Sequence, residues 1–161
     1  MFLKTAFLTF PVLVALQQDI NIENTIPPPL KIGTITSEFG DRIHPILNIS
    51  KPHFGIDISA EENSKALAIG AGIVIFAGEY AGYGNLVTVK HSNGISTHYA
   101  HLDNISLSVG WIIEEGDEIG TIGRTGNTTG LHLHFEVRKD GTPIDPVSAV
   151  PSLNALRGGS V

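Results

Sequence analysis

Histidines in this 161-residue chain stand in segments where apolar and polar residues alternate. One segment carries His132 and His134, two positions apart. A second carries His53 and Asp57, four positions apart, and a third contains His101. Neutral imidazole and carboxylate groups suit Zn²⁺, and a catalytic zinc site keeps three protein ligands and one open position. The chain has no cysteine, so any metal site must be built from histidine and carboxylate side chains.

Alternation along a β-strand indicates which of these side chains share a face, because residues two or four apart point the same way. In the last segment one face carries only polar side chains, and the opposite face is apolar. The polar set is His132, His134, Glu136 and Arg138, and the apolar set is Leu131, Leu133, Phe135 and Val137. The two histidines therefore border one site.

The segment from Pro52 to Ser59 shows the same alternation. If it is one strand, His53 and Asp57 share a face and the apolar residues, including Phe54, take the other. Gly55 lies between the two polar residues, and its missing side chain leaves room for an ion or another chain segment to approach closely.

The third segment, Ser96 to Leu102, contains two histidines of opposite parity. Strict alternation places His101 with Thr97 and Tyr99 and turns His98 to the other face. Spacing alone leaves two interpretations open, a shared metal site or histidines that are satisfied independently in the core. The zinc-protease signature H-E-x-x-H is absent.

Composition favours one all-β domain of antiparallel sheets with little helix. Glycine is frequent (18 residues), only 16% of residues are charged, and valine, isoleucine and threonine recur between the glycines. The Asn93-Gly94 pair is a strong hairpin signal, and a helical turn is expected only near 147–156. Strands are expected at 71–78, 86–90, 95–102 and 131–139.

The chain divides into four parts. Residues 1–17 are expected to form an export signal or, if uncleaved, a membrane anchor. Lys4 precedes an apolar stretch shorter than the roughly 20 residues of a membrane span. Residues 18–30 contain Pro27-Pro28-Pro29 and are expected to be a linker. The domain should cover 31–150, and 151–161 should be a loose tail. A net charge of −6 without a basic cluster argues against a nucleic-acid partner.

Several motifs in this order resemble those of the lysostaphin/LytM-type zinc metallopeptidases, which are bacterial peptidoglycan endopeptidases. The resemblance covers roughly 31–150 and implies a duplicated-hybrid-motif, barrel-sandwich-like fold. Leu131 stands where proline is common in that family, and 63–67 departs from its usual loop sequence. The matching motifs are Ser37–Pro45, His53–Asp57, Gly82–Asn85, Thr97–Leu102, Gly120–Gly126 and Thr129–Glu136.

The resemblance also implies roles for individual residues. It assigns the ligands of one Zn²⁺ to His53, Asp57 and His134, and the two catalytic histidines to His101 and His132. Water that completes the zinc sphere would attack a peptide carbonyl in a peptidoglycan cross-link. The division of roles between the two catalytic histidines stays open, as does the bond cut. Such an enzyme would be exported to the periplasm, or to the extracellular space or cell wall, and we expect a monomer.

Two other function classes compete with this one. A module of the same fold could bind the cell wall or activate another hydrolase without catalysis, but such relatives typically lack zinc-site residues, and all five positions are filled here. A carrier domain would leave the histidines unexplained. Among the remaining residues, Glu136 is expected to support the site, Arg42 and His44 to buttress a loop, and His91 to be solvated in the hairpin turn. His98 is expected at the surface or on a groove wall, on the opposite side from the metal.

Overall fold

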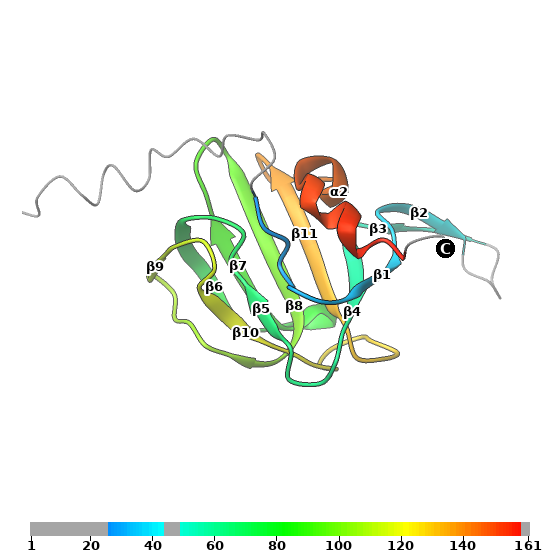
Figure 1. The fold of residues 1–161 in the computed structure, drawn as a ribbon, viewed down its shortest axis with the longest axis horizontal. Coiled ribbons are helices and arrows are strands. Elements are labelled where there is room, and N and C mark those ends of the chain that lie inside the picture. The colour runs from blue at the N-terminus through cyan, green and yellow to red at the C-terminus, as the bar shows by residue number, and fades with distance from the viewer. Residues whose placement is uncertain (1–25, 44–48, 159–161) are drawn as a thin grey trace, which may run out of the picture.

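The computed structural model describes residues 26–43 and 49–158 (Figure 1). The expected export signal, the first part of the linker, His44 and the last residues of the expected tail lie outside the described residues. The strands are β1 (Thr34–Ser37), β2 (Gly40–Ile43), β3 (Ser50–His53), β4 (Ile56–Ser59), β5 (Lys65–Leu67), β6 (Gly72–Tyr80), β7 (Gly84–Lys90), β8 (Ile95–Ile105), β9 (Ile112–Ile113), β10 (Glu118–Ile122), β11 (Leu133–Lys139) and β12 (Thr142–Ile144). The helices are η1 (Ala81–Tyr83), α2 (Pro146–Ala149) and η2 (Pro151–Leu156).

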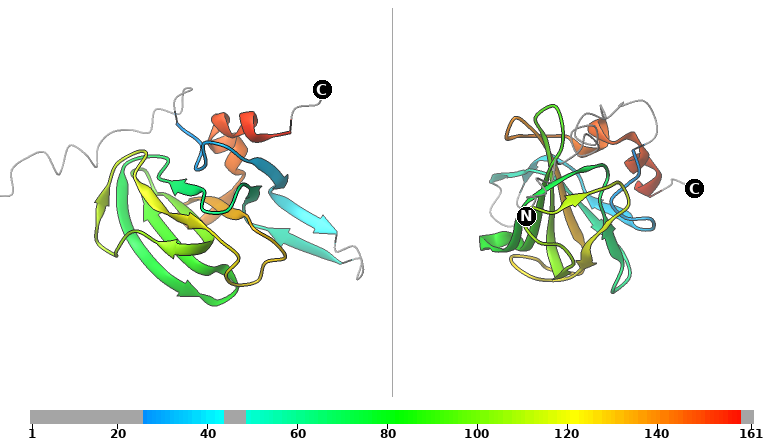
Figure 2. Two further views of the ribbon diagram at one scale, coloured as in Figure 1. Left: turned by 60° about the horizontal axis from the view of Figure 1, so that its bottom comes forward. Right: turned by 90° about the vertical axis from the view of Figure 1, so that its left-hand side faces the viewer.

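All strand pairs in the described part of the chain are antiparallel, which confirms the predicted all-β class. The main sheet has the order β1-β4-β11-β8-β7-β6-β9, with β12 beside β11 and β10 pairing both β5 and β8. Strands β2 and β3 form a separate two-stranded sheet, which projects from the body (Figure 1). In Figure 2 the main sheet is strongly curved, and β10 lies in front of the long strands β7 and β8.

Strand β11 is at the centre of the fold and follows the predicted alternation. Leu133, Phe135 and Val137 are buried in the core, where the Phe135 ring packs on Tyr99 of β8 with 5.3 Å between ring centroids. The opposite face carries His134, which lies across from Asp57 of β4 in the strand register. One strand thus separates the apolar core from a polar face.

The segment predicted as one strand from Pro52 to Ser59 is instead broken into β3 and β4. Strand β3 pairs with β2 in the small sheet, whereas β4 joins the main sheet. Phe54, expected in the core, is 45% exposed. The break occurs at Gly55, where the chain passes so close to β11 that a Cβ would lie 2.3 Å from the Phe135 carbonyl oxygen.

The expectation of a loose tail is wrong for the described residues after Val150. Leu153 and Leu156 of η2 are buried in the core cluster. The preceding α2 begins at an N-cap, Asp145, whose Oδ1 accepts the backbone N–H of Val147 at 3.0 Å. Leu30, expected in the linker, is also buried in the core. Apolar side chains at both ends extend the packed unit beyond 31–150, because their burial stabilises it.

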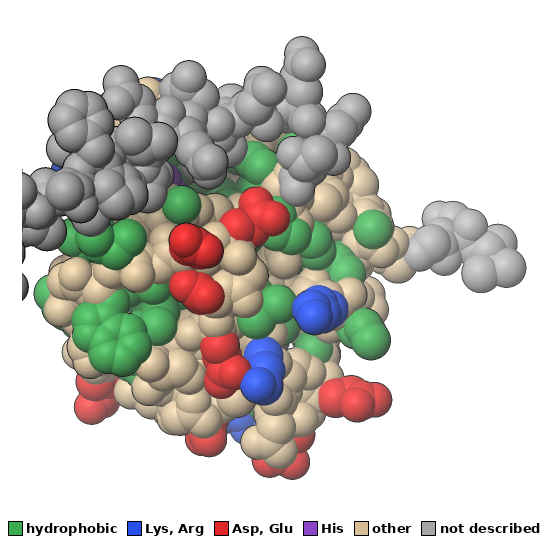
Figure 3. Space-filling view, turned by 60° about the vertical axis from the view of Figure 1, so that its left-hand side comes forward, with side chains coloured by type: hydrophobic (Ala, Val, Ile, Leu, Met, Phe, Trp, Pro, Cys, Tyr) green, Lys and Arg blue, Asp and Glu red, His purple; other side chains and the backbone are tan. Residues whose placement is uncertain are grey.

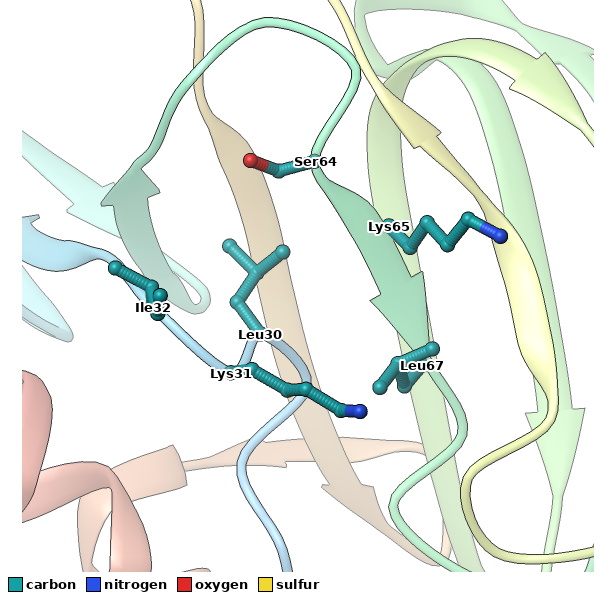
Figure 4. Close-up of a pocket in the computed structure, with 6 residues that line it drawn as sticks. All are labelled: Leu30, Lys31, Ile32, Ser64, Lys65 and Leu67. Carbon is teal, nitrogen blue, oxygen red and sulfur yellow. The ribbon is translucent and has the colours of Figure 1, made fainter.

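Two surface features complete the fold. On the face shown in Figure 3, acidic side chains gather near the centre, with few lysines and arginines among them. A hollow of about 270 Å³ lies between the segment leading into β1 and strand β5, with Leu30 and Leu67 beside Lys31 and Lys65 (Figure 4). No helix among the described residues is long and apolar enough to cross a membrane.

Candidate metal centre

Three side chains from β3, β4 and β11 converge on one point. His53 Nε2 lies 3.1 Å from both Asp57 Oδ1 and His134 Nδ1, and the last two atoms are 2.8 Å apart. Of the described residues, these three form the group of histidine and acidic side chains whose arrangement could hold a metal ion. The structure therefore brings together all three residues that the resemblance implies as zinc ligands.

The hydrogen bonds on the far sides of the two rings determine which nitrogens carry protons. His53 Nδ1 lies 2.7 Å from the Glu38 carbonyl oxygen, which can only accept, so Nδ1 is the protonated nitrogen. His134 Nε2 lies 3.0 Å from Glu136 Oε1 and donates to that carboxylate. In their neutral forms both rings therefore turn a lone pair toward the common point.

Asp57 completes the set as an anion. Burial raises the pKa of this carboxyl group, but the close approach of the His134 and His53 rings outweighs it and holds the pKa well below its usual range. Three lone-pair donors within about 3 Å of one another cannot satisfy each other without a cation. The donor set of two imidazoles and one carboxylate fits Zn²⁺.

Behind His134 lies a buried polar cluster centred on Glu136, whose side chain is fully buried. Its carboxylate accepts hydrogen bonds from His134, from the Tyr83 hydroxyl at 2.8 Å and from Arg138 Nε at 2.7 Å. Burial raises the pKa of Glu136, but these three donors together lower it to about 2. The pKa of Tyr83 rises to about 12 through burial and its bond to this carboxylate. Glu136 is therefore an ionised acceptor that orients His134.

His132 and His101 stand beside the three converging donors. Their ring centroids are 4.9 Å apart, and His101 lies 5.8 Å from His134. Each ring is tied by Nδ1 to a backbone carbonyl oxygen, that of Gly130 at 3.0 Å for His132 and that of Thr125 at 2.8 Å for His101. The unprotonated nitrogen of each neutral ring is thus Nε2, and in His132 this atom lies 3.6 Å from Asp57 Oδ1.

His101 reaches the site by a different route from the one predicted. Thr97 and Tyr99 are fully buried, and Tyr99 packs in the core, so strict alternation would have turned His101 into the core as well. Instead the register of β8 shifts by one residue between Tyr99, opposite Val87, and Leu102, opposite Asn85. His101 has a positive φ of 60°, rare for residues with a side chain. This bulge turns the His101 ring to the metal face.

The prediction for His98 also differs from the structure, because its neighbours Thr97 and Tyr99 point into the core and His98 alternates with them. This residue lies opposite Glu136 in the register of β8 and β11, so it is on the face of His134 and not on the opposite side. His91 was expected to be solvated but is buried, with its ring bonded to the Ala71 carbonyl and the Thr97 hydroxyl, each at 2.8 Å. Both differences arise from tertiary contacts between strands.

Arg42 and the backbone supply contacts that side-chain motifs do not reveal. Arg42 bonds to Ser37 Oγ at 2.6 Å and lies 3.6 Å from Asp57 Oδ2, so it faces the site as well as supporting its loop. The carbonyls of Glu38, Gly130 and Thr125 orient three of the four site histidines. Every residue has a backbone carbonyl, so the sequence does not show which of them orient the histidines. Only the tertiary structure identifies these three.

Five side chains of the site line a surface cleft of about 440 Å³: His53, Asp57, His101, His132 and His134. The β2–β3 hairpin forms one wall through Arg42 and Lys51, and η1 forms another through Gly82 and Tyr83. The loop before β11 contributes further residues, Asn127, Thr128 and Thr129. The hollow of Figure 4 contains none of the five side chains. The cleft is therefore where a substrate can reach the converging donors.

Comparison with known proteins agrees with this geometry. Residues 51–146, which include all five side chains, match the family described as Peptidase family M23. The chain belongs to peptidase family M23. This confirms the resemblance to the lysostaphin-type peptidases.

Relatives within the family share the sequence and the fold. DD-carboxypeptidase/endopeptidase Mpg of Neisseria meningitidis serogroup B is 44% identical over 125 residues, covering 77% of this chain and 29% of that protein. Peptidoglycan DD-endopeptidase ShyB of Vibrio cholerae is 34% identical over 127 residues, covering 78% and 30%. The crystal structure of a zinc containing peptidase from Vibrio cholerae superposes with a TM-score of 0.70 at 34% identity, covering 75% and 38%. The chain spans about a third of these relatives' lengths.

Proposed function

We propose that this protein is a zinc-dependent endopeptidase that hydrolyses peptide cross-links of bacterial peptidoglycan. The observation that carries the proposal is the convergence of three lone-pair donors, His53, Asp57 and His134, in an open cleft beside two further histidines. Membership of peptidase family M23 supports it, as does the similarity to a protein named as a peptidoglycan DD-endopeptidase.

The three converging residues would hold the metal ion. When bound, Zn²⁺ lowers the pKa of a coordinated water to about 7 and polarises a substrate carbonyl. Asp57 contributes a negative charge that is present throughout the neutral range, because its pKa is held low. Glu136 and the Glu38 carbonyl keep the two imidazoles in the tautomers that turn a lone pair to the metal.

His101 and His132 would move the protons of the reaction. Both Nδ1 atoms are occupied by backbone carbonyls, so both Nε2 atoms are free to accept a proton from the attacking water. Burial lowers the pKa of His101, which keeps this ring neutral and able to act as a base at neutral pH. A proton taken up at Nε2 can then stabilise the developing oxyanion or pass to the leaving amine.

The remaining parts of the proposal follow from the substrate. Peptidoglycan lies outside the cytoplasmic membrane, so the protein would act in the cell envelope, either in the periplasm or at the cell wall. All five side chains come from one chain, so a monomer is sufficient for the site. The non-catalytic alternative is not favoured, because it leaves this complete set of donors without a purpose.

Zinc content and peptidoglycan digestion test the proposal together. The purified protein should contain close to one zinc ion per chain and release new amine termini from peptidoglycan, with mass spectrometry identifying the bond cut. His134→Ala should lose both zinc and activity. His132→Ala should keep the zinc and lose activity, which separates metal binding from proton transfer. A protein without bound zinc that releases no new amines would contradict the proposal.

A further inference from the structure

A second hollow of about 460 Å³ adjoins the metal cleft. Tyr80 and Tyr83 line both spaces, so the hollow continues the cleft across the same face of the sheet. Its other lining residues come from β6, β7, β8 and β11 and from Gly141, in the turn after β11. The reaction described above uses no group in this hollow except Tyr83, which acts through Glu136.

The strand register shows how the hollow is built. Glu136 of β11 lies opposite His98 of β8, His98 lies opposite Thr88 of β7, and Thr88 lies opposite Phe76 of β6. These four residues form a row across the sheet, next to the row that contains His134 and Ala100. The metal site and the hollow therefore lie on neighbouring rows of one sheet.

His98 is the unsatisfied group of this row. Its Nδ1 is buried 4.0 Å from Glu136 Oε2 and is the buried side-chain nitrogen or oxygen without a hydrogen-bond partner among the described residues. Burial lowers the pKa of His98 to about 4, so the ring is neutral at neutral pH. The nearby carboxylate favours the proton on Nδ1, which leaves Nε2 as an acceptor for a group that enters the hollow.

Part of the wall of the hollow is apolar and exposed. Ile75 is 48% exposed and Tyr80 is 53% exposed, and Tyr80 contacts the ring of Phe76 edge-on at 5.7 Å between centroids. Charge is balanced, because Arg138 is paired with Glu136. The hollow therefore suits a neutral ligand that has an apolar body and a hydrogen-bond donor.

We propose that this hollow is a subsite that binds one arm of the peptide substrate beside the scissile bond. A neutral peptide segment would pack against Ile75 and Tyr80 and donate an N–H to His98 Nε2. This inference rests on the proposed function, because continuity with the metal cleft is what makes the occupant part of the same substrate.

The test compares substrates that differ in one arm. Ile75→Ser and His98→Phe are assayed on a cross-linked muropeptide dimer and on two shortened dimers, each lacking the outer residues of one arm. Each substitution should raise KM for the full dimer roughly tenfold, which corresponds to about 1.4 kcal/mol, with kcat changed less than about twofold. For the shortened dimer that lacks the arm bound in the hollow, the variants and the parent should have the same KM. Trp111→Ser, 54% exposed and outside both spaces, is the matched control.

Direct binding separates failure of the subsite from failure of the proposed function. In a His132→Ala background, the dissociation constant for the intact dimer should rise roughly tenfold on adding Ile75→Ser or His98→Phe. If the parent cleaves nothing but this loss of binding is seen, the proposed reaction fails and the subsite stands. If the parent cleaves the dimer and neither substitution changes KM or binding, the subsite is overturned. An equal rise in KM for the full dimer and for both shortened dimers also overturns the subsite.

Discussion

Glu136 Oε1 accepts the Nε2–H of His134 at 3.0 Å, on the side of the ring away from Asp57. The carboxylate is fully buried and also bound by Tyr83 and Arg138, so its position is fixed independently of the metal ligands. This contact selects the tautomer of His134 with its lone pair on Nδ1. It also makes the ring a better electron donor to a cation.

Replacing this carboxylate should therefore weaken metal binding. Glu136→Gln keeps the shape of the side chain but removes the charge, and we expect zinc affinity to fall about 10–100-fold. Competition with a chelator of known affinity measures the change. Glu118→Gln is the control, because Glu118 pairs with Lys65 at 2.7 Å far from the histidines. Equal affinities in Glu136→Gln and the parent would show that Glu136 is only a structural residue.

The crossing of Gly55 and β11 leaves no room for a side chain beside the site. A Cβ on Gly55 would meet the Phe135 carbonyl oxygen at 2.3 Å and Glu136 Cγ at 2.8 Å. Gly55→Ala should lower the free energy of unfolding by about 1–3 kcal/mol or more, because the backbone of β11 must move. Gly130→Ala, with nothing within 4 Å of its added Cβ, is the control for thermal unfolding. Two variants with equal melting temperatures would contradict the close approach.

Burial of His98 should make the protein less stable in weak acid. Its pKa is about 4 in the folded protein and about 6.5 when unfolded, so the unfolded state binds the proton first. Stability contributed by the neutral ring is complete above pH 6.5 and falls by up to about 3 kcal/mol as the pH drops to 4. His98→Gln should lose less stability over this interval, as measured by urea unfolding at matched zinc concentrations. Parallel curves for the two proteins would show that His98 does not titrate in this way.

The C-terminal helix should contribute to the stability of the domain. Leu153 is fully buried, so Leu153→Ala should cost about 2–5 kcal/mol through lost burial and the cavity left behind. Asn154→Ala, at the neighbouring exposed position, should cost less than about 1 kcal/mol. Denaturant unfolding of both variants measures the difference. A small effect of Leu153→Ala would restore the interpretation of 151–157 as a loose tail.

The sequence by itself was sufficient for the fold class and for the face of β11. Alternation is a local property of a strand, and the apolar set of Leu133, Phe135 and Val137 could be buried in only one direction. The pairing of His132 with His134 follows from the same local rule. The motifs then identified the family, which the match over 51–146 confirms.

Only the tertiary structure decided how the other site residues reach that face. A bulge in β8 with a positive φ at His101 cannot be recognised from alternation, because the sequence pattern there continues unbroken. The break at Gly55 depends on how closely β11 passes, and the burial of Leu153 depends on contacts with residues far along the chain. The partners of the histidines are largely backbone carbonyls, which every residue possesses. Long-range packing decides which backbone carbonyls face the histidines of the site.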